Sequence, residues 1–159
     1  MEPINESDRE WTELEQGDTK LRRNQLGDAA GNEQLGCSLY ELPAGCQSWQ
    51  YYYHTANEEA IYMLSGTGTL RLDGDTHSLR EGDYVPFLSN ESGGHRVIND
   101  SDAPLRYLTL STMQEPDVTV YPEMNKLGVF VGGAPGDRGD RSLHGYYNID
   151  TNVDYWEHD

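Results

Sequence analysis

From Leu35 onward, short runs of β-branched, aromatic and aliphatic residues alternate with Gly, Pro, Asn and Asp. Runs of this kind predict strands separated by turns. We expect strands at Leu35–Leu42, Trp49–His54, Glu59–Leu64, Thr67–Leu72, Thr76–Leu79, Tyr84–Phe87, Gly94–Asn99 and Leu105–Thr112. Asp73-Gly74 predicts a hairpin between two of them, because a type I′ turn needs positive φ at both central residues. Eight short strands at this spacing predict an all-β fold, an antiparallel sandwich or barrel.

The regular pattern covers residues 35–115, which we interpret as a barrel domain flanked by two extensions. The N-terminal extension, residues 1–34, is polar; we expect a short helix at Arg9–Glu15 and a connecting segment at Asn24–Gly31. The C-terminal extension, residues 116–159, has a further strand pattern at Leu127–Val131. Its aromatic end, Val153–Trp156, is expected to pack on the barrel or on a partner subunit, because aromatic side chains are seldom left in solvent.

Charge narrows the range of partners. The chain has 159 residues, the size of one domain. It carries 28 acidic residues against 11 basic ones, for a formal net charge of −17. A field of this sign opposes binding to nucleic acid and to anionic membrane surfaces. Eleven Tyr and three Trp supply apolar area for a core despite this charge. We therefore expect a folded domain with neither nucleic acid nor a membrane as partner.

The cations are mostly arginine, since Lys20 and Lys126 are the only lysines. Few lysines and many carboxylates are typical of proteins from salt-loving microbes. At molar salt the Debye length falls to about 3 Å, so dense carboxylates no longer repel one another strongly. An ordinary acidic cytosolic protein is the alternative interpretation of the same composition.

The expected location is the cytoplasm. No apolar run approaches the roughly 18 residues of a membrane span, and residues 1–7 lack the cationic start and apolar stretch of a secretory signal. Cys37 and Cys46 lie nine positions apart with no second pair. We expect two reduced thiols rather than a disulfide.

Candidate chemistry lies in three residues, His54, Glu59 and His95. Imidazole and carboxylate ligands together suit Fe(II), Mn, Ni or Zn. On one unbroken strand His54 and Glu59 would face opposite sides, so they converge only if residues 55–57 bend. Taken singly, a strand His is usually a surface or hydrogen-bonded residue, and adjacent Glu residues are usually solvated. Three other histidines have less context: His77 and His158 are expected at the surface, and a contact role for His144 has no support.

These residues occur in two segments that resemble the paired motifs of the cupin superfamily. His54, Glu59 and Gly66 match the second His, the Glu and the Gly of the first motif. The second motif is matched by Gly82, Pro86, His95 and Asn99. The resemblance covers Leu35–Ser111 and implies a small antiparallel barrel, the double-stranded β-helix, with a pocket inside. Further segments resemble a group of uncharacterised single-domain cupins: Leu26-Gly27 with Ala30-Gly31, Asn57-Glu58-Glu59, Tyr121-Pro122 with Lys126, and Val153-Asp154-Tyr155-Trp156.

One position departs from the family pattern. Tyr52 stands where cupins usually carry their first metal-binding His, so the ligand set implied here is His54, Glu59 and His95. Tyr52 and His54 are two residues apart, and both side chains can face one interior. Two outcomes are open. A metal remains bound by two His and one carboxylate, or the pocket holds no metal and Tyr52 hydrogen-bonds Glu59 or a ligand.

The resemblance implies a cupin that binds a divalent metal (Fe, Mn, Ni or Zn) and a small organic ligand. Catalysis is left open; the metal-dependent activities to consider are those of a dioxygenase, an isomerase or a lyase, with Tyr52 as proton or hydrogen-bond donor. The alternative is a non-catalytic, metal-free small-molecule-binding or regulatory module. Aromatic residues at Trp49, Tyr51 and Tyr53, together with the edge strands of an open barrel, favour a homodimer.

Overall fold

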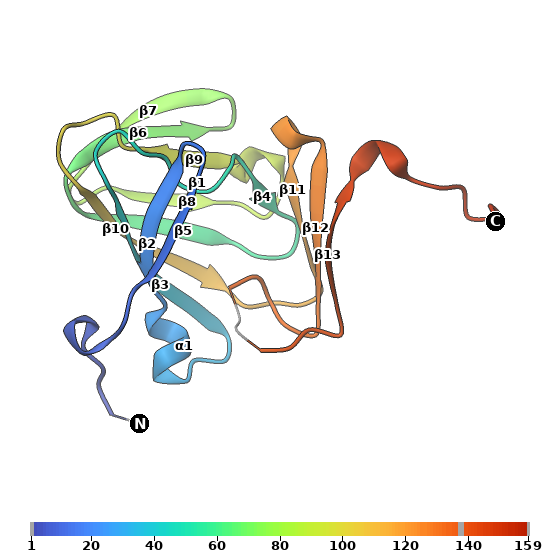
Figure 1. Cartoon of the computed structure of the whole chain (residues 1–159), viewed down its shortest axis with the longest axis horizontal. Coiled ribbons are helices and arrows are strands. Elements are labelled where there is room, and N and C mark those ends of the chain that lie inside the picture. Colours follow the sequence, from blue (N-terminus) through green and yellow to red (C-terminus); the bar gives the residue numbers. More distant parts are fainter. Residues whose placement is uncertain (1, 137–138, 159) are drawn as a thin grey trace.

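The computed structural model describes residues 2–136 and 139–158, which are almost entirely β-structure (Figure 1). The strands are β1 (Thr12–Gln16), β2 (Thr19–Asn24), β3 (Leu35–Leu42), β4 (Tyr53–His54), β5 (Glu59–Ser65), β6 (Thr67–Leu72), β7 (Asp75–Arg80), β8 (Tyr84–Phe87), β9 (His95–Ile98), β10 (Leu105–Thr112), β11 (Asp117–Tyr121), β12 (Lys126–Val131) and β13 (Leu143–Asn148). Helical turns occur at η1 (Glu6–Asp8), α1 (Leu26–Ala30), η2 (Glu91–Gly93), η3 (Pro122–Met124) and η4 (Ile149–Thr151).

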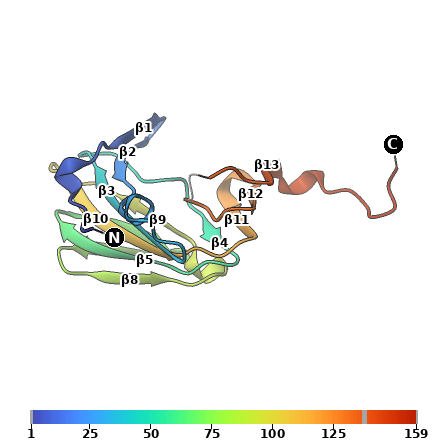
Figure 2. The same ribbon diagram turned by 90° about the horizontal axis from the view of Figure 1, so that it is seen from below.

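The strands form three antiparallel sheets. The largest has the order β1-β2-β3-β10-β5-β8, and a smaller one has the order β7-β6-β9. The main hydrophobic core lies within this part of the chain, around buried residues such as Leu42, Ile61, Met63, Leu70 and Leu105. The third sheet, β13-β12-β11-β4, stands at one side of the barrel (Figures 1 and 2). The expected all-β architecture of antiparallel strands is therefore confirmed.

The hairpin predicted at Asp73-Gly74 is present between β6 and β7. Asp73 has φ of 49° and Gly74 has φ of 82°, the positive values that a type I′ turn requires at both central positions. Non-glycine residues seldom adopt positive φ, and Asp is among those that tolerate it. The local sequence therefore determines this connection.

The N-terminal extension differs from the expectation. Of the residues expected to form a helix at Arg9–Glu15, Thr12–Glu15 instead belong to β1, which pairs with β2, and Leu14 lies opposite Leu21. Leu14 packs against the core in this way, so burial beside a partner strand outweighs local helix propensity. The segment expected as a connection contains the short helix α1.

The C-terminal extension forms β11, β12 and β13, and β11 pairs with β4 next to His54. Its last residues do not pack back on the barrel within this chain: Tyr155 is 86% and Trp156 75% exposed, and the tail points away from the body (Figure 2). The expectation for Val153–Trp156 was therefore wrong for the barrel, and packing on a partner subunit stays a prediction. The domain division at residues 34 and 115 likewise stays a prediction.

Two further features concern the cysteines and the lengths of the helices. Cys37 and Cys46 are both free thiols. In residues 2–136 and 139–158 no helix has the length and apolar character needed to cross a bilayer.

Candidate functional site

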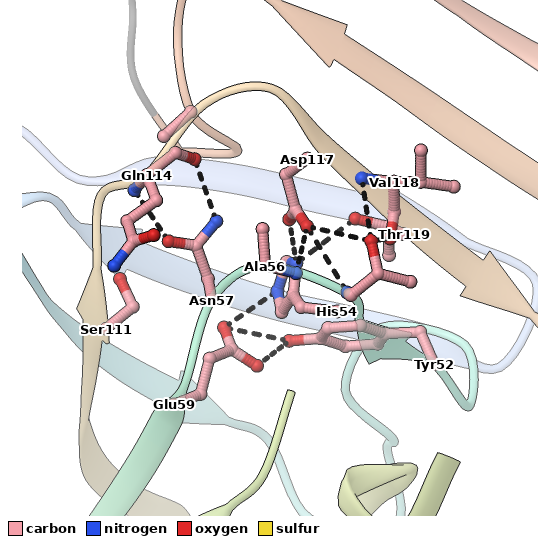
Figure 3. Close-up of polar contacts among 12 residues, drawn as sticks. Tyr52, His54, Ala56, Asn57, Glu59, Ser111, Gln114, Asp117, Val118 and Thr119 are labelled. Atoms are coloured by element: carbon pink, nitrogen blue, oxygen red, sulfur yellow. Dashed lines mark hydrogen bonds and ion pairs between the residues drawn. The ribbon is translucent and has the colours of Figure 1, made fainter. Parts of the chain in front are cut away.

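The side chains of Tyr52 and His54 converge on the carboxylate of Glu59 on β5, next to the C-terminal sheet (Figure 3), and His95 approaches the same carboxylate. His54 Nε2 lies 3.3 Å from Glu59 Oε1, and His95 Nε2 lies 3.6 Å from Glu59 Oε2. The Tyr52 hydroxyl donates to Glu59 Oε2 at 3.0 Å. The side chains of His54, Glu59 and His95 are each 10% exposed or less. The structure thus brings together all four residues that the sequence singled out, while their roles stay predictions.

His54 and Glu59 face the same interior because the chain bends between them, as their spacing required. The bend is held by Asp117 on β11, whose Oδ1 accepts from the backbone N–H groups of Thr55 at 3.2 Å and Ala56 at 2.8 Å. The side chain of Asn57 continues the attachment: its Nδ2 donates to the Gln114 carbonyl and its Oδ1 accepts from the Gln114 N–H. The C-terminal segment therefore shapes the site (Figure 3).

Each imidazole is oriented through its Nδ1 atom. His54 Nδ1 donates to Asp117 Oδ2 at 2.6 Å, and His95 Nδ1 donates to the Gly93 carbonyl at 2.8 Å. The His95 ring also stacks on Phe87 with centroids 3.5 Å apart. A donor at Nδ1 leaves Nε2 as the atom that faces Glu59 on both rings. This is the arrangement by which acceptors commonly fix metal-ligating histidines.

Gly93 is required for the orientation of His95. A Cβ atom at this position would lie 1.9 Å from the carbonyl oxygen of Leu88. The turn η2 therefore closes tightly only without a side chain here, and this closure places the Gly93 carbonyl under His95 Nδ1.

Proton affinities in the site depend on its burial and its carboxylates. Burial alone would lower the pKa of His54, but Glu59 and Asp117 outweigh it and raise that pKa from 6.5 to about 10. Burial lowers the pKa of His95. Burial and the adjacent Glu59 carboxylate raise the pKa of Tyr52 well above 10, so its hydroxyl stays protonated at neutral pH. His54 therefore lies between two carboxylates, Glu59 at Nε2 and Asp117 at Nδ1, and both favour its protonated form.

The chemistry of the donors fits a divalent transition metal. Two imidazole Nε2 atoms and a carboxylate suit Fe(II), Mn, Ni or Zn, and a cation bound at His54 Nε2 would require that this nitrogen carry no proton. The hydrogen bonds at both Nδ1 atoms would remain. Within residues 2–136 and 139–158, however, no three His, Cys, Asp or Glu side chains are already placed so that they could hold a metal ion.

A cavity of about 870 Å³ leads from this cluster to the surface. The barrel lines it with residues that include Tyr40, Trp49, Tyr52 and Glu59. One face of the C-terminal sheet forms a further wall, with His54, Thr119, Tyr121, Lys126, Phe130, His144 and Tyr146. A volume of this size is within the usual range for small-molecule sites.

The sequence pattern did not single out Asp117 or most of the residues with which the C-terminal sheet lines the cavity. The only local signal for Asp117 was a carboxylate at the start of a short β-branched run, which does not reveal its partner on β4. His144, for which no role was supported, lines the cavity. His77 and His158 are exposed, as expected.

Comparison with known proteins identifies the barrel. Residues 38–111 match the cupin domain family. A candidate sugar phosphate isomerase from Acidithiobacillus ferrooxidans has a similar structure, with a TM-score of 0.73 and 27% identity over 88% of this chain and 83% of that one. The cupin β-barrel predicted from the sequence is thereby confirmed. No curated protein is similar enough to match this chain.

Two other solved structures are similar. A sugar phosphate isomerase of the cupin superfamily from Silicibacter pomeroyi has a TM-score of 0.72 and 26% identity over 82% of this chain and 78% of that one. A polyketide cyclase from Streptomyces resistomycificus has a TM-score of 0.61 and 19% identity over 70% of this chain and 79% of that one, a likeness of fold alone.

Proposed function

We propose that the cupin domain at residues 38–111 binds a divalent metal through His54, Glu59 and His95, and acts as an isomerase on a small organic molecule held in the cavity. The observation that carries this proposal is the orientation of the two imidazoles. Both Nδ1 atoms donate to fixed acceptors while both Nε2 atoms face one buried carboxylate. Acceptors behind Nδ1 are the usual means by which proteins fix metal-ligating histidines.

The substrate class that we propose is a phosphorylated sugar. Its support is the likeness to the two sugar phosphate isomerases, which extends over more than four fifths of this chain. Isomerisation between aldose and ketose moves a proton from the carbon beside the carbonyl to the former carbonyl carbon, and the hydroxyl proton moves from one of the two oxygens to the other. The oxygens of the substrate carry negative charge between the removal and the return of the carbon-bound proton.

The chain's residues suit that requirement. When bound, the metal would supply Lewis acidity toward the substrate oxygens. Tyr52 stays protonated because its pKa is raised, so its hydroxyl can donate a hydrogen bond to the oxygen that becomes negative. Asp117 holds the ring of His54 in place. Burial of the cluster excludes bulk water, which strengthens each of these interactions.

The test has two parts. Elemental analysis of the purified native protein should find about one transition metal per chain, and His95→Ala should lose it while His77→Ala keeps it. Proton NMR in D₂O should then show deuterium incorporation beside the carbonyl of an aldose phosphate, with Tyr52→Phe slower than the wild type. A native protein without metal, or no exchange over a broad panel of sugar phosphates, would overturn the respective part.

A metal-free binding module is the second candidate, and one observation favours it. The carboxylate of Glu59 already interacts with both imidazoles and with Tyr52, so the cluster is electrostatically satisfied without a cation. This candidate predicts that added Fe(II), Mn, Ni or Zn leaves the thermal midpoint unchanged. A clear rise in the midpoint on metal addition contradicts it.

We further propose a homodimer. Apolar side chains are exposed along the edge strand β13 and the tail, at Leu143, Tyr146, Tyr147, Val153, Tyr155 and Trp156. An edge strand with an exposed aromatic surface favours pairing with a second copy. Light scattering should give twice the chain mass of 17.9 kDa, and removing residues 149–159 should shift the protein toward the monomer.

We also propose that the protein is located in the cytoplasm and that nucleic acids are not among its partners.

A further inference from the structure

Within residues 2–136 and 139–158, five of the cationic side chains form ion pairs with carboxylates. Carboxylates partner the cationic side chains of Lys20, Arg22, Arg71, Arg96 and Arg106. With 28 carboxylates in the chain, a half-buried cation that lacks such a partner is unexpected. Two such cations, Lys126 and Arg23, line the cavity, and neither forms an ion pair with any carboxylate in residues 2–136 and 139–158.

Lys126 projects from the C-terminal sheet close to the cluster around Glu59. It lies opposite Tyr121 across the β11–β12 pair, and opposite residues of an antiparallel pair share a face. The ring of Tyr121 is 6.0 Å from that of Tyr52, whose hydroxyl donates to Glu59. The aromatic pair of Tyr121 and Tyr52 therefore lies between Lys126 and Glu59.

Arg23 approaches from the opposite sheet. It lies on β2 opposite Tyr40 of β3, and its guanidinium is 5.6 Å from the ring of Trp49. Tyr40 and Trp49 both line the cavity, and the Trp49 indole N–H donates to the Tyr40 hydroxyl. A guanidinium over an aromatic ring keeps its N–H groups available at its edges for an acceptor.

The remaining charges on the lining do not neutralise this pair. Arg141 adds a third cation and donates to the carbonyls of Gly133 and Ala134. Apart from Glu59, the carboxylates of the lining are Asp28 and Glu33, and both of these residues are exposed. Lys126 and Arg23 are half-buried, where a charge without a counter-charge is costly.

From these observations we infer that Lys126 and Arg23 form an anion subsite on the cavity lining, called the outer end below to distinguish it from the Glu59 cluster, which holds the phosphate or carboxylate group of the ligand whose other end lies at Glu59. The inference rests on the proposed function, because it assigns the charged end of that same ligand. Lysine and arginine are the side chains that bind phosphate and carboxylate groups most strongly, through charge-assisted hydrogen bonds.

The chain provides its own matched controls. Lys20 is the only other lysine, and it pairs with Glu15 on the surface. Arg22 precedes Arg23 on the same strand but pairs with Glu41. Lys126→Gln can therefore be compared with Lys20→Gln, and Arg23→Gln with Arg22→Gln, each pair changing the net charge equally.

Calorimetry at constant ionic strength would measure the affinity for inorganic phosphate, for acetate, and for an aldose phosphate beside the unphosphorylated aldose. We expect the phosphorylated sugar to bind at least tenfold more tightly than the sugar. Lys126→Gln and Arg23→Gln should each remove most of that preference, and the two controls should keep it. Tighter binding of phosphate than of acetate identifies a phosphate ester, and the reverse order identifies a carboxylate.

Equal losses in the subsite variants and the controls, or no preference for any anion in the wild type, would overturn the inference. Metal content, measured on the same samples, separates this failure from that of the proposed function. Lys126→Gln lies outside the proposed ligand set, so it should retain the metal of the wild type. A metal-bound protein without anion preference overturns only the subsite, whereas a metal-free protein that keeps the preference overturns only the metal.

Discussion

The two ends of the cavity differ in how far the protein satisfies its own polar groups. At the inner end, Tyr52, His54 and His95 all interact with Glu59, and both imidazoles have a second partner behind them. At the outer end, Lys126 and Arg23 line the cavity with no carboxylate partner in the described chain. The protein's own side chains satisfy the polar groups of the inner end, whereas the cations of the outer end have no carboxylate partner among the described residues.

This difference separates two tasks. A rigid, hydrogen-bonded cluster holds reacting groups at fixed positions, which lowers the cost of organising them during a reaction. Cations without partners select a ligand by its charge. Substitutions at the inner end should therefore change metal binding and chemistry, and substitutions at the outer end should change ligand affinity.

The strongest expected effect is at His95. His95→Ala removes one of three proposed ligands, so metal affinity should fall by much more than the roughly 10–100-fold typical of a residue behind a ligand. His77→Ala, which changes an exposed residue, should leave it unchanged. Titration of the metal-free proteins with metal at one salt concentration measures both.

In the same metal titration, Tyr52→His is expected to have the opposite effect to His95→Ala. The substitution restores the imidazole that the family usually carries, and it should tighten metal binding. Retention of wild-type metal by His95→Ala, or failure of both the wild type and Tyr52→His to bind metal, would leave only the metal-free cavity.

The next effect concerns Asp117. Asp117→Asn keeps an oxygen for the backbone N–H groups of Thr55 and Ala56 but removes the charge that orients His54. Metal affinity should fall by about 10–100-fold. Asp102→Asn, a change in an exposed loop, is the control. Equal affinities in the two variants would mean that the C-terminal sheet does not support the inner end.

A stability effect is expected at Gly93. Gly93→Ala places a methyl group against the Leu88 carbonyl, and overpacking of this kind costs about 1–3 kcal/mol. The exposed neighbour provides the control Ser92→Ala, which keeps its backbone N–H bond to Asn90. Urea unfolding of both variants measures the cost, and a Gly93→Ala midpoint equal to that of the control would contradict the close approach.

The smallest expected effect is that of salt concentration on the thermal midpoint. Screening of 28 carboxylates should raise the thermal midpoint between low salt and molar KCl, by about 2–4 °C for each kcal/mol of repulsion removed. Anion affinity at Lys126 should fall over the same range, while the buried inner end should be less sensitive. A midpoint that stays flat or falls would remove the expectation of a salt-adapted protein.

The sequence predicted the elements whose signals are local. Leu35–Leu42, Thr67–Leu72, Tyr84–Phe87 and Leu105–Thr112 are strands with the expected bounds, because alternation and turn residues are properties of neighbouring positions. Glu59 and the two histidines were found because their spacing matches a known pattern. In each case the information lies within a few residues.

Features that depend on distant pairing were not predicted. The role of Asp117 follows from the pairing of β11 with β4, which no pattern within either segment specifies. The strand at β1 exists because β2 lies beside it. Trp156 is exposed, although its residue type favours burial. The anion subsite likewise could not be predicted, because Arg23 and Lys126 belong to two different sheets and line one cavity only in the folded chain.

The bond between His54 and Asp117 spans 63 positions, and this separation has a consequence for synthesis. Ribosomes add about 5–20 residues per second, so roughly 3–13 s pass between the emergence of the two residues. During that interval His54 and Glu59 exist without the carboxylate that turns them toward one interior. A nascent chain can begin its barrel, but the part that is translated last completes the site.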